Sequence, residues 1–377
     1  MLRDSLAEPA AAHHVEQLEI VFASGTDAAR VDAAWRATVA SCEVLRTAFG
    51  ETGDEKLAQS LAATWPEMEI HPHSLPCDAA WLEENRLRPV LNSGRVPWRT
   101  SFHPTERKWL WTFHHALLDG RSITRILQVF LNHLEDKPCE NLSHSLWRPP
   151  CAEAVKAATA AFQHIRRDCP PLDWPPDLTD DSAPAVRRLG REIAGELETQ
   201  AVARQVTAAT IVTWAWGQAL ADFLGTDAVL VEQLRAGPPQ PATAGFTMNV
   251  LPLMIRRSSV AALPAFRSEL LAMRAFESVS PENFPAGIYP ETSAAPVIMV
   301  EHETLPHALR EFPEIESVTL HERPADFPSA TAFLHPELQL QVEGPHRHDL
   351  LARWGAILKS PDFCIAGVRT AAGRVRR

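Results

Sequence analysis

Four residues in one short segment of the sequence have the types and spacing that proton transfer needs. They are His114, His115, Asp119 and Gly120, in the stretch HHALLDG. An imidazole, with a usual pKa of about 6.5, gives and takes a proton at neutral pH. A lone histidine is more often a hydrogen-bonded core residue than a catalyst, but its combination with an aspartate and a glycine favours a functional loop.

The elements on either side must hold this segment in place. Residues 108–115 read KWLWTFHH, a nearly continuous apolar run that predicts a strand covered on both faces. Side chains alternate across a strand, so His114 and His115 should point to opposite sides, and a single one of them can face a reacting group. From Ser122 onward an amphipathic helix is predicted by the helical spacing of Ile123, Ile126, Leu127, Phe130, Leu131 and Leu134.

Both halves of the chain mix strands and helices. Residues 15–22, with Leu18, Ile20 and Phe22 on one face, predict a strand, and a helix through about Cys42 follows it, capped by Thr26 or Asp27. Prolines accumulate from 138 to 187 around a predicted helix at 152–167, and we place a boundary near 170–180. Later patterns predict helices over 207–224 and 347–358 and strands over 228–234, 245–255 (interrupted by Pro252), 296–300 and 338–342. We therefore expect an α/β protein with two domains, 1–172 and 173–377.

The composition excludes several classes of function. A formal net charge of -11 argues against nucleic acid as a partner, because phosphate contacts need a clustered basic surface. No stretch approaches the roughly 18 apolar residues of a membrane span, so no membrane association is expected. The six cysteines form no CxxC pair and have no histidine at ligand spacing, so we expect no metal site. Six isolated thiols suit a reducing compartment and a cytoplasmic location.

The segment HHALLDG, followed by Arg121 and Ser122, resembles the HHxxxDG motif of one acyltransferase superfamily. This superfamily includes the condensation domains of nonribosomal peptide synthetases and chloramphenicol acetyltransferase. Three further segments support the resemblance, which extends from about residue 15 to residue 358. They are VLRTAF at 44–49, similar to the family's LRTxF stretch, the predicted helix and strand over 207–231, and AGFTMNVLPLMIR at 244–256, similar to GxFxNTLPLR.

The resemblance implies a fold of two chloramphenicol acetyltransferase-like lobes that form a V-shaped pseudo-dimer with a central tunnel. The sequence departs from the family pattern in three places. The usual N-terminal helix motif is not recognisable before Val15, the loops over 275–330 are reduced, and Val250 stands where the family often has threonine. These departures concern the donor and acceptor channels more than the chemistry.

The resemblance also implies a role for each residue of the motif. His115, the second histidine, faces the tunnel and acts on the attacking amine or hydroxyl, as a general base or by positioning it. His114 is a buried supporting residue. Asp119 holds the loop through an ion pair to an arginine, for which Arg46 and Arg235 are both candidates. Gly120 leaves room for a pantetheine arm.

Three further residues are expected to bind substrate. Asn249 lies in the 244–256 segment that resembles the family. Arg121 and Arg125 fall in the first turn after the motif, where a helix N-terminus and nearby cations suit a phosphate of the pantetheine arm. The alternative is that both arginines are ordinary solvated helix residues. The earlier pair His13-His14 lacks such a context and is expected to be solvated.

The function implied by the resemblance is a condensation-type acyltransferase that joins a thioester-bound acyl group to an amine acceptor. The alternatives are an ester-forming O-acyltransferase and a non-catalytic relative that binds a carrier protein. The donor, linked to phosphopantetheine or coenzyme A, is a substrate, so no bound cofactor is expected. The chain has no recognisable adenylation domain and no Gly-Gly-x-Ser-like carrier site, so we expect a stand-alone enzyme that meets an acyl or peptidyl carrier protein on a separate polypeptide, or a coenzyme A thioester, and a small-molecule acceptor.

Overall fold

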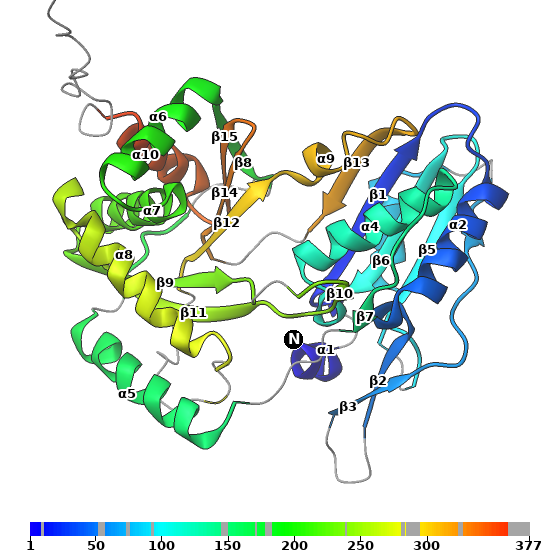
Figure 1. Cartoon of the computed structure of the whole chain (residues 1–377), viewed down its shortest axis with the longest axis horizontal. Helices are drawn as coiled ribbons and strands as arrows, with labels where there is room; N and C mark the ends of the chain where they lie inside the picture. The colour runs from blue at the N-terminus through cyan, green and yellow to red at the C-terminus, as the bar shows by residue number, and fades with distance from the viewer. Residues whose placement is uncertain are drawn as a thin grey trace, which may run out of the picture. The chain divides into compact units, whose positions relative to one another are not determined.

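The computed structural model describes residues 1–8, 11–51, 57–72, 76–91, 94–144, 150–169, 172–177, 183–237, 240–279, 283, 295–322 and 327–360. The chain divides into two compact units (Figure 1). Unit 1 comprises Met1–Trp147, Pro238–Met248 and Leu305–Arg323, and unit 2 comprises Arg148–Gly237, Asn249–Thr304 and Pro324–Arg377. None of the described helices is long and apolar enough to cross a bilayer.

This division differs from the boundary that the sequence suggested near residues 170–180. Unit 1 ends at Trp147, so the helix α5 (Ala152–Asp168) lies in unit 2, and two later segments return to unit 1. The reason is a long-range strand pairing. β13 (Ile315–His321) pairs antiparallel with β1 (Val15–Phe22), and local patterns in a sequence carry no information about such a partner.

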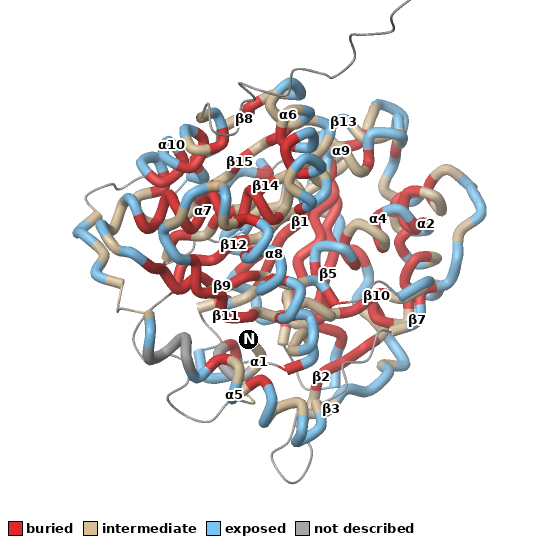
Figure 2. The backbone as a smooth tube through the Cα atoms, turned by 60° about the vertical axis from the view of Figure 1, so that its left-hand side comes forward, coloured by how far each residue is buried: buried red, intermediate tan, exposed pale blue. Residues whose placement is uncertain are grey.

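The main sheet of unit 1 has the strand order β13-β1-β6-β5-β4. Helices α2 (Ala28–Ser41) and α4 (Gly120–Leu134) pack against each other and share one hydrophobic core with this sheet. In Figure 2 much of β1, β5 and α4 is drawn as buried. The other elements of unit 1 are α1 (Leu2–Ala7), η2 (Glu43–Arg46), β2 (Thr47–Glu51), β3 (Leu57–Leu61), β4 (Glu69–Ile70), α3 (Ala79–Leu87), β5 (Trp98–His103), β6 (Lys108–His114), η3 (His115–Leu117), β7 (Ser143–His144), β10 (Thr243–Ala244) and α9 (Leu305–Ala308).

A cluster of aromatic rings fills the core beneath β6. The Trp35 ring centroid lies 5.4 Å from Trp98, 5.0 Å from Trp109 and 5.1 Å from Trp111, in edge-on contacts. Phe130 of α4 adds a further edge-on contact to Trp35 at 5.5 Å. These rings are all buried, and such pairs stabilise a core beyond the area they remove from water. The cluster therefore fixes the strand that leads to the histidines.

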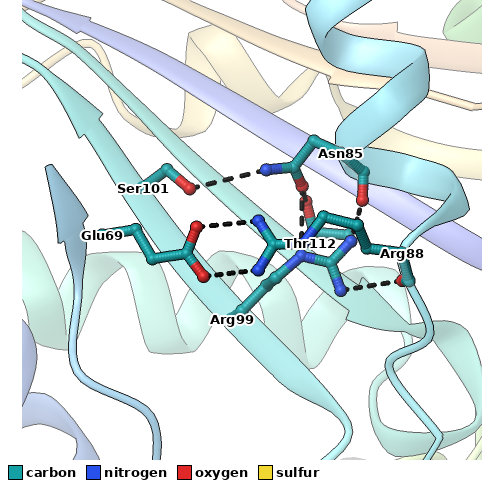
Figure 3. Close-up of polar contacts among 6 residues, drawn as sticks. All are labelled: Glu69, Asn85, Arg88, Arg99, Ser101 and Thr112. Atoms are coloured by element: carbon teal, nitrogen blue, oxygen red, sulfur yellow. Dashed lines mark hydrogen bonds and ion pairs between the residues drawn. The ribbon is translucent and has the colours of Figure 1, made fainter. Parts of the chain in front are cut away.

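A polar network joins β5 and β6 to α3 (Figure 3). The guanidinium of Arg99 donates to the Asn85 side chain at 3.2 Å and to the Arg88 carbonyl at 2.9 Å, and the Thr112 hydroxyl donates to Asn85 Oδ1 at 2.7 Å. Arg88 and Glu69 form a two-pronged ion pair at 2.7 and 2.6 Å. Burial lowers the pKa of Arg99 to about 10. Buried polar groups are tolerated when they are hydrogen-bonded, so this side of the sheet depends on complete pairing.

Unit 2 is built on a sheet with the order β11-β9-β12-β14-β15-β8. Helix α7 (Ala208–Leu224) is buried along most of its length, begins at the N-cap Thr207 and ends at Gly225, whose φ of 66° is left-handed. At Gly217 the helix approaches β11 so closely that a Cβ would overlap the Ile255 side chain. The remaining elements are β8 (Ala185–Leu189), α6 (Gly190–Ala203), β9 (Ala228–Arg235), β11 (Asn249–Arg256), η4 (Val260–Ala262), α8 (Leu263–Ala272), η5 (Met273–Phe276), β12 (Val297–Glu303), β14 (Ser329–His335), β15 (Leu338–Glu343) and α10 (Arg347–Leu358).

The predicted elements are largely confirmed, with one clear difference. The strand expected over 245–255 begins at Asn249 and ends at Arg256, and the residues before it belong to unit 1. Pro252 lies inside this strand, opposite Glu232 of β9. β11 is the first strand in its sheet, and proline, which lacks an N–H, is tolerated on such an edge.

Candidate functional site

The HHALLDG segment connects a buried strand to the start of a helix, as predicted. β6 ends at His114, η3 covers His115–Leu117, and α4 begins at Gly120. His115 lies 2.7 Å from the Leu118 carbonyl through its Nδ1 atom, and its own N–H donates to the His14 carbonyl at 2.7 Å. A carbonyl accepts, so Nδ1 must carry the proton, and in the neutral ring Nε2 keeps its lone pair. The His115 side chain is 20% exposed.

His114 is completely buried, and its ring is bonded on both nitrogens. Nδ1 accepts from the Ala116 N–H at 3.1 Å, so Nε2 carries the proton and donates to Ser5 Oγ at 2.9 Å. The Ser5 hydroxyl in turn donates to the His13 carbonyl at 2.8 Å. Burial lowers the pKa of His114 to about 3, so the ring stays neutral. These contacts hold the end of β6 in position.

Asp119 holds the loop, but through different partners from those expected. Its Oδ1 atom accepts from the Ser122 N–H at 2.9 Å and caps α4. Its Oδ2 atom accepts from Thr247 twice, from the backbone N–H at 3.0 Å and from the hydroxyl at 2.8 Å. A helix N-cap favours an aspartate because the first backbone N–H groups have no partner inside the helix.

Neither arginine candidate is seen to pair with Asp119. Arg235, in unit 2, forms an ion pair with Glu277 at 2.9 Å and donates to Gln233 at 3.1 Å. Arg46 in η2 is half-buried, and its Nε atom has no hydrogen-bond partner among the described residues. Inside unit 1 the carboxylate is thus held by a cap and a threonine contact, and its pairing with an arginine stays a prediction.

The segment 240–247 packs against the HHALLDG segment and the start of α4. Ser122 Oγ donates to the Gly245 carbonyl at 2.8 Å and accepts from the Gly245 N–H at 3.0 Å. The ring of Phe246 lies edge-on to His115 with 5.6 Å between centroids. Together with the contacts between Asp119 and Thr247, these bonds join two parts of unit 1 that are distant in the sequence.

Arg125 also contacts the segment 240–247. Its Nη1 atom donates to the carbonyls of Gln240 and Thr243, both at 2.8 Å. Arg121 is exposed in the first turn of α4. The Nη1 atom of Arg125 thus has a structural role, and the binding of phosphate by either arginine stays a prediction.

The two arginines can be separated by substitution. We expect Arg125→Ala to lower the free energy of unfolding by about 1–3 kcal/mol, because hydrogen bonds from a charged donor contribute about that much. Arg121→Ala, in the same turn, should leave stability within about 0.5 kcal/mol, as exposed substitutions usually do. Urea denaturation measures both. Equal stability of the two variants would contradict the assignment for Arg125, and a raised KM for the donor in Arg121→Ala alone would support a phosphate seat there.

The side-chain amide of Asn249 bonds to backbone groups of unit 2. Its Nδ2 atom donates to the carbonyls of Glu277 and Val279, both at 2.9 Å, and Oδ1 accepts from the Val250 N–H at 2.8 Å. An amide has two N–H donors, and both are used here. The side chain therefore fastens residues 277–279 to β11, and its role in binding substrate stays a prediction.

A carboxylate that the sequence analysis did not single out lies beside His115. Glu16, in β1, stands opposite Phe113 in the strand register and so shares the face of Phe113 and His115. Its Oε1 atom is 3.5 Å from His115 Nε2. Burial raises the pKa of Glu16, while the charge of Arg86, and that of His115 when its ring is protonated, act in the opposite direction. Oε2 is buried and has no hydrogen-bond partner among the described residues.

The sequence contained a signal for Glu16. In the strand VEQLEIVF the apolar face is formed by Leu18, Ile20 and Phe22, and Glu16 continues that face by the period of two. A charged residue at a core-facing position is unusual and marks a candidate functional group. For Ser5, Phe246 and Thr247, the sequence holds no comparable local signal. His14 was expected to be solvated, yet it is half-buried and its ring lies 6.2 Å from that of His114.

One further group of potential metal ligands lies elsewhere in unit 1. His71, Cys77 and His103 place one ligand atom each within 4.8 Å of one another, although their spacing in the sequence does not suggest a site. The Glu106 N–H donates to His103 Nδ1 at 3.1 Å. A neutral imidazole that accepts at Nδ1 carries its proton on Nε2, which opposes metal binding through that nitrogen. We assign no function to this group.

The sequence of this chain is similar to parts of peptide-synthesising enzymes. No protein-family model matches the chain. Nonribosomal peptide synthetase 5 of Aspergillus fumigatus is 25% identical over 255 residues, which are 59% of this chain and 11% of that protein. A linear gramicidin synthase of Brevibacillus parabrevis is 25% identical over 289 residues, which are 68% of this chain and 4% of that protein. The chain thus spans about a tenth or less of these two relatives.

Structural comparison extends over nearly the whole chain. The first condensation domain of the calcium-dependent antibiotic synthetase, in complex with a substrate analogue, superposes with a TM-score of 0.69 at 17% identity, covering 96% of this chain and 94% of that one. The condensation domain from the Monacolin K polyketide synthase MokA gives a TM-score of 0.71 at 15% identity with the same coverage. These two matches confirm the condensation-domain fold that the sequence implied.

Proposed function

We propose that this protein, which has the condensation-domain fold, transfers an acyl group from a thioester donor to an amine acceptor and forms an amide. His115 is the residue that meets the attacking nitrogen. His114 and Asp119 position it, the first through the end of β6 and the second through the cap of α4 and the contact to Thr247.

The observation that carries the proposal is the state of the His115 ring. Its Nδ1 proton is held by the Leu118 carbonyl, so Nε2 is the basic nitrogen, on a side chain that is partly exposed. A thioester is already activated, so the enzyme mainly has to align it with a nucleophile and move one proton. A fixed imidazole with one free lone pair is suited to that task.

The donor is proposed to be linked to phosphopantetheine or to coenzyme A, and the chain needs no bound cofactor. A carrier protein on a separate polypeptide is the partner that a carrier-linked donor would require. The multidomain synthetases among its relatives support this proposal, since a carrier-linked substrate suits such assemblies. A cytoplasmic location agrees with such a partner.

Gly120 offers a test of the donor path. It is exposed, begins α4 with an ordinary backbone, and a Cβ placed there would meet no atom within 4 Å. The fold therefore does not require glycine. We expect Gly120→Ala to leave stability within about 0.5 kcal/mol, as exposed substitutions usually do, and to lower turnover by about tenfold or more if an arm passes over this position.

The matched control for this variant lies in another helix. Gly195 in α6 also has no neighbour within 4 Å of a Cβ, so Gly195→Ala tests the helix effect alone. Steady-state rates with a pantetheine thioester donor and thermal melting compare the two variants. Unchanged turnover in Gly120→Ala would contradict the proposed donor path.

The direct test is an assay with defined donors and paired acceptors. Acyl-coenzyme A, an acyl-pantetheine and an acyl carrier protein are each offered with a primary amine and with the alcohol of the same carbon skeleton, and products are identified by mass spectrometry. Amide formation supports the proposal. Ester formation alone would establish an O-acyltransferase, and binding of the acyl carrier protein without any product would establish a non-catalytic relative.

A further inference from the structure

We propose that Glu16 and His115 Nε2 together bind the ammonium group of the acceptor, so that the site selects amines over alcohols. This inference rests on the function proposed above and names the groups that select its amine acceptor. It assigns a role to a carboxylate that lies outside the HHALLDG motif.

The geometry of two acceptor atoms is the first argument. Glu16 Oε1 and His115 Nε2 are 3.5 Å apart, longer than an ordinary hydrogen bond of about 2.7–3.2 Å. The Leu118 carbonyl holds the Nδ1 proton, so neutral His115 offers a lone pair at Nε2, and ionised Glu16 offers lone pairs as well. Two acceptors side by side have no proton to share between them. A group with several N–H donors satisfies both.

Burial is the second argument. The Glu16 side chain is 11% exposed, and Oε2 has no hydrogen-bond partner among the described residues. An unsatisfied buried carboxylate is destabilising, so its presence on the apolar face of β1 needs a reason. The remaining exposed fractions of Glu16 and His115 leave a route by which a small cation can reach them.

The surrounding charges agree with this arrangement. Arg86 of α3 donates to the Val15 carbonyl at 2.6 Å and to the His321 carbonyl at 2.8 Å, and its charge favours an ionised Glu16. His114, at the end of β6, is neutral because burial lowers its pKa to about 3. His14 precedes β1 and contacts the His114 ring. A cation next to Glu16 therefore meets no competing charge from His114.

The proton balance of the step follows from the two groups. The ammonium gives one proton to the Glu16 carboxylate and becomes a neutral amine. Its nitrogen then attacks the thioester carbonyl, the C–N bond forms, and the C–S bond breaks. The second proton of the nitrogen passes to His115 Nε2 and from there to the leaving thiolate, and Glu16 returns its proton to solvent. An alcohol has a single O–H and cannot donate to both acceptors.

The test compares Glu16→Gln with Glu19→Gln. Both residues lie in β1, but Glu19 points to the other face and lies 3.5 Å from both Lys108 and His321. We expect Glu16→Gln to lower kcat/KM for the amine by about tenfold to a hundredfold, the usual effect of losing a hydrogen bond to a charged group, with the loss carried by KM as well as kcat. The ratio of kcat/KM for the amine to kcat/KM for the matched alcohol should fall by a similar factor, whereas Glu19→Gln should leave this ratio unchanged.

Two further measurements separate binding from a structural effect. Burial raises the pKa of Glu16 above its ordinary value of 4.5, so protonation of this carboxylate should contribute to the loss of amine transfer on acidification, and Glu16→Gln should lose that contribution. The raised pKa also means that the ionised side chain disfavours folding above that pKa, so Glu16→Gln should melt at or above the parent temperature there. Glu16→Asp keeps the charge and should retain part of the preference for amines.

The outcomes distinguish this inference from the proposed function. If the parent protein transfers no acyl group to any acceptor, the proposed function is wrong. If the parent is active and Glu16→Gln leaves the ratio of amine to alcohol rates unchanged, or Glu16→Asp shows no preference for amines, the role of Glu16 is wrong and the proposed function stands.

Discussion

Replacing His115 with alanine is expected to lower turnover by about a hundredfold to ten-thousandfold, the usual contribution of a residue that transfers a proton in the rate-limiting step. The fold should stay intact, because the side chain contacts the Leu118 carbonyl and the Phe246 ring at a partly exposed position. Steady-state rates and thermal melting of the purified variant measure the two effects separately.

Two other histidines control for this substitution. His13→Ala removes an exposed imidazole 3.3 Å from Glu8 and should change neither rate nor stability. His114→Ala removes a buried ring that bonds to Ser5 and Ala116, so it should lower the melting temperature together with the rate. A His115→Ala protein that keeps the parent rate would overturn the role assigned to this residue.

The Asp119→Ala variant is expected to lose about 2–4 kcal/mol of stability, from the lost helix cap and the lost contacts to Thr247. Activity should fall with it, because the same carboxylate fastens the segment that carries Phe246 against His115. Urea denaturation gives the change in the free energy of unfolding, and the rate is measured at a temperature where the variant is folded.

Asparagine at position 119 separates the stability that comes from the helix cap from the stability that comes from the contacts to Thr247. Asn is as good an N-cap as Asp, so Asp119→Asn should keep the bond to the Ser122 N–H. Its amide N–H group would face the Thr247 N–H, which is also a donor, so that contact should be lost. We expect a stability between those of the parent and the alanine variant. An Asp119→Ala protein as stable as the parent would rule out the cap and the threonine contact as the role of this residue.

Much of the local structure could be predicted because its signals are local. The helical spacing from Ile123 to Leu134 identified α4, and Asp27, one of the two predicted caps, caps α2. The motif itself supplied the loop. In each case the pattern lies within a few residues of the structure it predicts.

The contacts of the site depend on register and on long-range pairing, which a single sequence does not show. Thr247 is 128 residues from Asp119, and the pairing of β1 with β6 brings Glu16 to His115. The sequence pointed to an arginine as the partner of Asp119 and held no sign of the backbone N–H groups of Ser122 and Thr247, from which the carboxylate accepts. Asn249 was expected to bind substrate, but the turn at residues 277–279 takes both of its donors.

The cluster around Trp35 gives the protein an optical signature. The sequence has 11 tryptophans and one tyrosine, so the aromatic circular dichroism arises almost entirely from indoles. Trp35, Trp98, Trp109 and Trp111 lie close enough, 5.0–5.4 Å from Trp35, for their transitions to couple. Such a near-ultraviolet signal vanishes when fixed packing is lost, even if the helices persist. Because two of these indoles belong to the strand that ends at His114, the share of the signal that comes from this cluster reports on the packing beneath that strand.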